Sequence, residues 1–517
     1  MIRIFKWLTV VFVFGCCCYI VASWKMKKEV VQFLDRKVPD HIDFSYDTFT
    51  INLFKGNLDF ENINVISLGR QTSSCEIRVN AHNLSITGFS YWKIFFKKSV
   101  YIETLTLNKP HLYFKTCPKT SAENAAKSNP IHLLKEIFIE DLIFNAGRIE
   151  IWDNREETEL VAVKSIDLYL KKVATDPKVI TNYVPFTFAD YGIAVQNFKA
   201  PLGDFERLQI EGMELDSKSI HVNNLSLTTL LSKEDLSQKI TYQRDHVNLV
   251  VPAITVDQHT NEVSKDSLQV NFKSFSLTDP ILEMYRDKSK LENFKTRPLY
   301  AEVLRKLPFK LAVDSVFIEK GSIVYEENIP NNVKAGALRF ENLDATISNL
   351  SNLIPTRDKL KIELNSELMG AGKFFLNWEF NVQNPQNTFI VSGGLSNFNT
   401  SNLNEFLVPN LRAKTSGTID QLYFTISGDD NVASGAIKMK YEDFKFQVLN
   451  KERSGVKKVL SFIGNLFIND GSNTDTDGYR HGEISTERSK NKSFFNYLWI
   501  NLEDGLLDVL TGSGKKE

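Results

Sequence analysis

Apolar and polar residues alternate with a period of two over most of the chain, from about residue 41 to residue 450. The run Val163–Leu170, which reads VKSIDLYL, is a clear example. Because successive side chains of a strand point to opposite faces of a sheet, this pattern places apolar side chains on one face only. The alternation predicts a mostly β body with one apolar and one polar sheet face.

One eight-residue pattern recurs: apolar, polar, apolar, two polar, apolar, polar, apolar. In a strictly alternating strand, the doubled polar pair would throw the second half onto the wrong face. A β-bulge at the pair restores the face and curves the strand, and a two-residue hairpin turn also restores it. We favour the bulge, which predicts an elongated, curled (taco-like) antiparallel sheet. The six copies span residues 58–65, 79–86, 220–227, 270–277, 338–345 and 439–446.

A looser repeat of thirteen residues carries Pro or Gly at its ninth position and apolar residues on both sides. It predicts a strand, turn, strand unit that is used several times. The copies are Ile102–Phe114, Ile139–Ile151 and Val313–Tyr325, with Pro110, Gly147 and Gly321 at the turn.

The N-terminus carries 18 consecutive uncharged residues, from Trp7 to Trp24. As a helix this run is about 27 Å long, close to the hydrocarbon thickness of a bilayer. We therefore predict a transmembrane anchor over residues 1–24. A cleaved signal peptide is the alternative, and the length of the run and its Trp residues favour the anchor. The predicted anchor side chains are Trp7, Val11, Val13, Ile20 and Trp24.

Helical patterns interrupt the strands in three places. Residues 25–40 are predicted as a juxtamembrane helix, and residues 279–308 as a helical insertion that begins at Asp279-Pro280. The tail, residues 451–517, is predicted to contain one helix over 456–468, a polar loop over 469–492 and a last helix over Phe494–Leu510. The remaining sections, 41–278 and 309–450, are the two predicted β sections.

Composition adds mainly exclusions. The chain has 517 residues, of which 42% are hydrophobic and 11% aromatic, so disorder is excluded as its main state. A net charge of -1 gives no basic field for nucleic acid. The histidines stand singly, and no phosphate loop or nucleophile elbow occurs, so we predict no catalytic residue, no metal and no cofactor. A disulfide bond between Cys75 and Cys117 is one alternative, and two isolated thiols are the favoured one.

Several segments resemble a known family. Val100–Phe114, Leu403–Ile419 (LNEFLVPNLRAKTSGTI), Gly435–Phe446, Val459–Ile468 and Arg488–Leu506 resemble, in order and spacing, the AsmA-like family of bacterial envelope proteins in its Bacteroidetes form. The resemblance implies a single-pass inner-membrane protein whose body lies in the periplasm. It also implies bridge-like transport of phospholipids and a role in outer-membrane biogenesis.

The apolar face suits that function, since acyl chains need a continuous apolar surface while headgroups stay in water. The expected partners are phospholipids, the inner membrane and an outer-membrane or envelope protein. The competing hypothesis is a tethered scaffold or assembly factor with a closed β core, and an enzyme is the weakest hypothesis. The candidate groove-lining residues are Phe60, Ile63, Val79, Leu84, Leu107, Val222, Leu227, Phe272, Phe275, Phe340, Leu343, Tyr441 and Phe444.

The last helix carries a dense aromatic group: Phe494, Phe495, Tyr497 and Trp499. One hypothesis is that these side chains contact a membrane or a partner. The alternative, which we favour, is that the helix packs on the last strands through Leu502, Leu506 and Leu510.

Overall fold

The computed structural model places the chain in two compact units. Unit 1 comprises Met1–Pro201, Gln209–Val222 and Val263–Asp266, and unit 2 comprises Leu202–Leu208, Asn223–Glu262 and Ser267–Glu517. The division therefore falls inside the predicted section 41–278 and not at the predicted insertion 279–308. The residues described are 20–21, 23–25, 27–28, 42–68, 76–90, 99–116, 136–153, 158–176, 179, 186–263, 268–330, 334–353, 358–449, 465–467 and 474–512.

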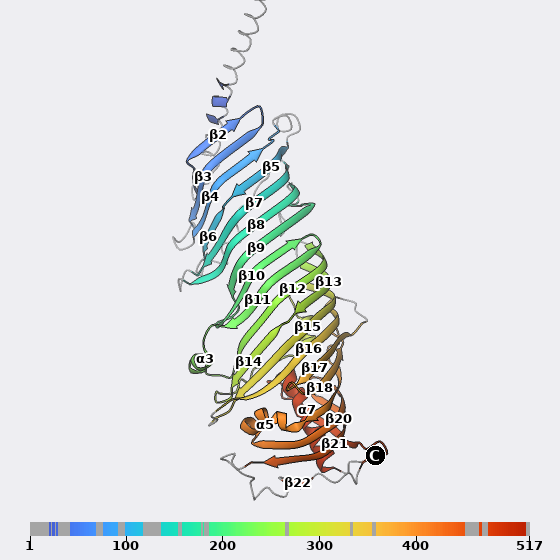
Figure 1. The fold of residues 1–517 in the computed structure, drawn as a ribbon. Coiled ribbons are helices and arrows are strands. Elements are labelled where there is room, and N and C mark those ends of the chain that lie inside the picture. The colour runs from blue at the N-terminus through green and yellow to red at the C-terminus, as the bar shows by residue number, and fades with distance from the viewer. Residues whose placement is uncertain are drawn as a thin grey trace, which may run out of the picture. The chain divides into compact units, whose positions relative to one another are not determined.

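Unit 1 is built from strands, as the alternation predicts (Figure 1). Most neighbours pair antiparallel, but β5 and β6 both pair parallel with β7, so the predicted purely antiparallel sheet is wrong and the sheet is mixed. The strands are β1 (Ile42–Ser45), β2 (Thr48–Asn52), β3 (Asn57–Leu68), β4 (Glu76–Thr87), β5 (Val100–Asn108), β6 (His111–Lys115), β7 (Ile137–Trp152), β8 (Glu159–Thr175) and β9 (Asp190–Pro201), followed by the hairpin ends of β10 (Glu206–Asp216) and β11 (Ser219–Thr229).

Unit 2 contains the longer strands and nearly all the helices that the structure describes (Figure 1). Its strands are β12 (Asp245–Val263), β13 (Leu268–Thr278), β14 (Ile281–Asp287), β15 (Lys310–Asn328), β16 (Gly336–Ser351), β17 (Leu360–Leu368), β18 (Gly372–Phe380), β19 (Phe389–Asn399), β20 (Ala413–Gly428), β21 (Val432–Val448), β22 (Asn465–Phe467) and β23 (Arg480–Glu487). Its helices are α3 (Lys233–Lys239), α4 (Tyr300–Arg305), η4 (Thr400–Leu403), α5 (Asn404–Leu411) and α7 (Phe494–Thr511).

The two units share a local arrangement around a proline. In unit 1, Lys109 has a left-handed φ of 50° and Pro110 follows, so β5 ends and β6 begins, and both pair parallel with the continuous strand β7. In unit 2, Asp279 has a φ of 50°, Pro280 follows, and β13 and β14 both pair parallel with β15. The thirteen-residue repeat is thus a bend within the sheet and not a turn that reverses the chain.

The eight-residue pattern lies within continuous strands and does not form hairpins. Each of the six copies lies within a single continuous strand; these strands are β3, β4, β11, β13, β16 and β21. In four copies the second residue of the doubled polar pair has a left-handed backbone, with φ of 49° to 51° at Asn62, Asn224, Asn342 and Asp443. Asn and Asp tolerate this region because their short polar side chains bond locally. A register shift at the polar pair confirms the bulge in the copies of β16 and β21.

Two segments that were predicted to lack strands contain one each. Within the predicted insertion 279–308, residues 281–287 form strand β14, because Leu282 and Met284 alternate with polar residues and face apolar partners on β12 and β15. The helix there is short, spanning α4 alone. The predicted loop 469–492 contains strand β23, which pairs with β21.

The predicted helix 456–468 lies mostly outside the described residues. Its described part, Asn465–Phe467, is strand β22 paired with β21, which contradicts a helix at that point.

The N-terminal predictions fall largely outside the described residues. Trp7, Val11 and Val13 are outside them, while Ile20 and Trp24 belong to a helical stretch and are each 64% exposed. No helix within the described residues combines the length and the apolar character needed to cross a bilayer. Most of the juxtamembrane segment 25–40 also lies outside them, as do both Cys75 and Cys117.

Candidate functional site

The candidate site of unit 1 is the apolar face of its sheet. Residues that are directly paired in a sheet share a face, so the register assembles apolar rows that cross the strands. Behind this face the alternate residues, such as Tyr169, point the other way. One row reads Phe60, Leu84, Leu107, Phe144, Leu168 and Ile193 from β3 to β9. A second row reads Val65, Val79, Leu112, Ile149, Val163 and Phe198.

Little covers this face among the residues that the structure describes. In the first row only Phe60 is buried, and the five side chains from Leu84 to Ile193 are half-buried. Over the described parts of residues 42–201, every named element is a strand, so these residues supply no helix to pack on the face.

The first strands of unit 1 form a tighter apolar cluster. Phe60 and Ile63 are buried together with Phe49 and Ala81, and the Phe49 and Phe60 rings stack with centroids 4.4 Å apart. The ammonium group of Lys27 lies 5.8 Å from the centroid of the Phe49 ring. Leu84 packs against this cluster, as does Leu107.

The apolar face of unit 2 passes from an uncovered to a covered region. One row reads Phe275, Val316, Ile347, Ile362, Trp378, Val391 and Ile426 from β13 to β20. The first four side chains are half-buried, whereas Trp378 is 8% exposed and Val391 and Ile426 are 0% exposed. The difference lies in what packs on the face.

Helices α4 and α7 cover the last strands. The Phe494 ring of α7 stacks on Trp378 with centroids 4.1 Å apart, and Tyr497 meets Phe389 edge-on at 5.9 Å. Leu299 and Ala301, at the start of α4, join the same buried cluster. The end of unit 2 is therefore a closed core.

The close seating of α7 depends on glycine. A Cβ on Gly505 would lie 2.7 Å from side-chain atoms of both Ile437 and Ile484, and a Cβ on Gly482 would lie 2.6 Å from the Gly505 carbonyl oxygen. The helix consequently buries a face of Phe494, Tyr497, Asn501, Gly505 and Val509. The predicted leucine side, with Leu502, Leu506 and Leu510, is partly buried and packs against the same core, which confirms that the helix packs on the last strands.

This packing corrects some of the predicted site residues. Phe494 and Tyr497 are 5% and 1% exposed, so they form core and are not contact residues, whereas Phe495 and Trp499 are 60% and 37% exposed. Tyr441 packs against the closed core, and burial raises the pKa of its phenol.

Phe444 is 8% exposed and its ring lies 5.8 Å from that of Tyr441. Tyr441 and Phe444 both lie on β21, one of the strands that carry the closed core. Neither therefore lines an uncovered face.

The other predicted lining residues lie on apolar faces. Phe272 and Phe275 lie edge-to-face on β13, 4.7 Å apart. Phe340 pairs with Ile323 and lies 5.6 Å from Phe374, and Leu343 is buried opposite Gly321. On β11, Val222 is buried and Leu227 half-buried, and Val79 belongs to the second row of unit 1.

Sequence reasoning missed a charged row at one margin of the unit 2 face. Asp245, Arg286 and Glu327 are paired across β12, β14 and β15, next to the apolar row of Val247, Met284 and Tyr325. The Arg286 guanidinium donates to both Asp245 carboxylate oxygens, at 2.7 and 2.6 Å.

The Tyr325 hydroxyl donates to Glu327 at 2.8 Å, and Lys288 pairs with the same carboxylate at 2.8 Å. Burial alone would lower the pKa of Arg286, but its hydrogen bonds to Asp245 raise it overall. The available sequence signal was that Arg286 of β14 and Glu327 of β15 are charged at positions where the alternation predicts an apolar residue.

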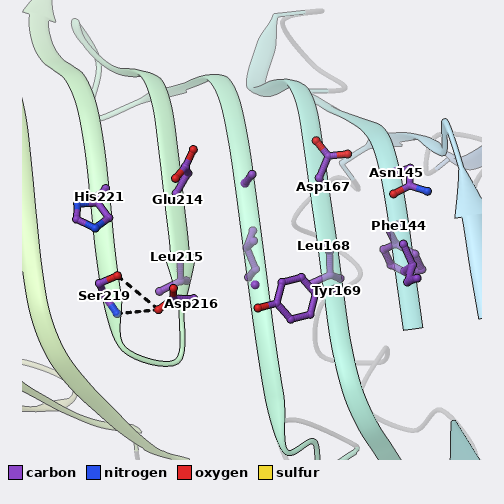
Figure 2. A pocket seen from close by; sticks show the side chains of 14 residues that line it. Phe144, Asn145, Asp167, Leu168, Tyr169, Glu214, Leu215, Asp216, Ser219 and His221 are labelled. Carbon is purple, nitrogen blue, oxygen red and sulfur yellow. Dashed lines mark hydrogen bonds between the residues drawn. The ribbon is translucent and has the colours of Figure 1, made fainter. Parts of the chain in front are cut away.

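A shallow hollow of about 410 Å³ lies on unit 1, lined by residues of neighbouring strands that include Leu168 and Tyr169 (Figure 2). The Tyr169 ring covers Gly192, where a Cβ would come within 2.1 Å of the ring. The acidic groups here have structural partners: Asp167 accepts from the backbone N–H of Ala146 at 2.7 Å, and Asp216 accepts from that of Ser219 at 2.9 Å. These two carboxylates thus support a bulge and a turn, and the lining of the hollow also includes Phe144, Leu168 and Ile193 of the first apolar row.

No cluster of three metal-ligating side chains occurs within the described ranges. The fold and the site define a mostly β protein with partly uncovered apolar sheet faces. No protein-family model matches the chain, and no curated protein matches it.

Proposed function

We propose that the apolar faces bind the acyl chains of phospholipids and that the protein conducts these lipids between two membranes without catalysis. Its N-terminal apolar run, Trp7 to Trp24, would anchor it in the first membrane. Following the resemblance to AsmA-like proteins, the two membranes are the inner and outer membranes of a bacterial envelope, and the body is periplasmic. The continuous apolar rows of unit 1 carry this proposal.

The rows are long enough to hold a lipid tail. From β3 to β9 the first row crosses six strand positions, which at about 4.8 Å spacing amounts to about 24 Å. One acyl chain spans roughly half of a hydrocarbon layer of about 30 Å. A tail that lies along the row would cover half-buried Leu, Phe and Ile side chains, and each buried methylene group contributes about 0.8 kcal/mol.

Left-handed residues within the strands favour a curved sheet. A left-handed residue in the middle of a strand increases the local twist and bends the strand towards one face. Repeated bends at Asn62, Asn342 and Asp443 would curl each unit into a trough around its apolar face. The headgroup would remain at the open margin, where the ionic row of Asp245, Arg286 and Glu327 lies in unit 2.

The scaffold hypothesis applies to one part of the chain. The closed core beneath α4 and α7 is filled by side chains such as Val391, Phe398 and Ile426, all 0% exposed, so it leaves no room for a lipid. That core is a stable platform at the end of unit 2. It does not account for the uncovered rows of unit 1.

Lipid retention tests the proposal. The full-length protein should co-purify with phospholipid detectable by mass spectrometry, and it should accelerate phospholipid transfer between vesicles. Leu168→Asp places a charge within the first row, between Phe144 and Ile193, and should abolish both. Tyr169→Asp is the matched control, since Tyr169 points to the opposite face and is 40% exposed. A lipid-free protein, or equal loss in both variants, would refute the proposal.

A further inference from the structure

Two segments that are far apart in the sequence form one surface in unit 2. The backbone N–H of Arg297 donates to the Lys490 carbonyl at 2.8 Å. The Asn491 side-chain amide donates to Glu292 at 2.6 Å, and the Lys492 ammonium pairs with the same carboxylate at 2.6 Å. We call residues 288–306 together with residues 488–499 the basic–aromatic surface.

This surface is strongly basic in a nearly neutral chain. It contains nine Lys and Arg residues and two Glu residues, which gives a formal charge of +7, whereas the whole chain has -1. Segregation of charge on this scale creates a local field that attracts anions, although the net charge of the protein is small.

Five of the nine cations have partners: Lys288, Lys306 and Lys492 form ion pairs with Glu327, Glu302 and Glu292, and Arg305 and Arg488 are held inside the fold. The Arg488 side chain is 2% exposed and pairs with Asp430, and Arg305 donates to the Asn384 carbonyl at 3.0 Å. By contrast, Lys295 and Lys490 are exposed, and neither forms an ion pair with any residue that the structure describes. The solvent-facing lysines are therefore available to an external anion.

Large apolar side chains lie exposed among these lysines. Phe294 is 78% exposed, Leu291 63% and Phe495 60%. Tyr300, 43% exposed, joins the two segments, because its ring lies 6.4 Å from that of Phe495. Exposed apolar groups gathered in this way mark an interaction site rather than ordinary surface.

We propose that the basic–aromatic surface docks on an anionic phospholipid bilayer. Aromatic and leucine side chains that insert at the headgroup level, beside lysines that meet anionic lipid, are the combination that holds proteins on such membranes. An acidic protein partner would satisfy the lysines but would not account for the exposed apolar side chains beside them, of which Phe294 is 78% exposed. The surface is distinct from the apolar rows, so this inference goes beyond lipid conduction and gives the body a second membrane contact.

A vesicle-tethering experiment tests the docking. The full-length protein is reconstituted through its N-terminal segment into phosphatidylcholine vesicles. Labelled vesicles of phosphatidylcholine, with or without about one third phosphatidylglycerol, are then added and their capture is measured by flotation. We expect capture of the anionic vesicles only, and it should weaken as salt is raised.

Two double variants locate the contact. Lys295→Glu with Lys490→Glu should reduce capture about tenfold, because it changes the local charge by four near an anionic surface. Phe294→Ser with Phe495→Ser should reduce capture at every salt concentration. Lys218→Glu and Phe54→Ser, at exposed positions of unit 1, are the matched controls and should have no effect.

Equal capture of neutral vesicles, or capture that both double variants leave unchanged, would overturn the docking proposal. Binding of an acidic protein with no capture of anionic vesicles would overturn it as well. Leu168→Asp separates this proposal from lipid conduction, since that variant should lose bound lipid yet still capture vesicles.

Discussion

The same substitution at two points of one apolar row should have very different costs. Val316 and Val391 both lie in the row that runs from Phe275 to Ile426 in unit 2, and both are flanked by apolar residues on the neighbouring strands. Val316 is half-buried in the region that the helices leave uncovered, whereas Val391 is 0% exposed within the closed core. We consider Val316→Asp and Val391→Asp.

The magnitudes follow from access to water. Val391→Asp loses about 1.5–3 kcal/mol of side-chain burial and also places a carboxylate where it has neither water nor a partner, which costs several kcal/mol more. The sum is comparable to the whole stability of a domain, about 5–15 kcal/mol. Val316→Asp loses about 1 kcal/mol of burial, and its carboxylate stays hydrated, so no desolvation cost is added.

Urea unfolding of the full-length variants, followed by circular dichroism and by limited proteolysis of unit 2, measures the contrast. We expect Val316→Asp to unfold near the wild-type midpoint and Val391→Asp to be largely unfolded in buffer. Equal, severe destabilisation by both would show that the first part of the row is also a closed core. That result would refute the argument for an uncovered face.

Three further outcomes concern α7 and the strands beneath it. Tyr497→Phe should stabilise the protein by about 1 kcal/mol in urea unfolding, since the buried hydroxyl has no hydrogen-bond partner among the described residues; a loss of stability would reveal a partner. Burial, with a smaller contribution from the charge of Asp429, raises the pKa of Tyr497 above its ordinary value of 10.0, so the stability that the neutral phenol provides is complete below pH 10 and falls as the pH rises further. Comparing denaturation at about pH 9 and about pH 11 should therefore show a fall in wild type that Tyr497→Phe reduces, and an equal fall in both would contradict the assignment. Asp504→Ala with Asp508→Ala should cause concentration-dependent association in sedimentation, because these carboxylates accept from the edge-strand N–H groups of Ser485 and Glu483, both at 2.8 Å; a strictly monomeric double variant would argue against this edge protection.

Local patterns were sufficient for the elements whose character is set by near neighbours in the chain. The alternation at Val163–Leu170 predicted a strand with one apolar face, and the doubled polar pair before Leu343 predicted a bulge, where Asn342 indeed has a left-handed φ of 49°. The apolar periodicity of the last helix predicted α7, which spans Phe494–Thr511. Each of these features depends on side chains within a few residues of one another.

Long-range contacts decided the rest. The sequence around Leu282 and Tyr285 fits a helix start after Asp279-Pro280, and only the pairing of β14 with β12 and β15 makes it a strand. The leucine side of α7 is the more apolar one, yet Gly505 lets the adjacent side approach β21 and β23 more closely.

The candidate sites divide in the same way. The alternation determined which side chains share the apolar face, but only the tertiary structure decided that α4 and α7 cover Val391 and leave Val316 half-buried. The basic–aromatic surface likewise exists only because Arg297 and Lys490 meet in the fold. The periodicity of a segment fixes the direction of its side chains, whereas what lies opposite them depends on chain segments hundreds of residues away.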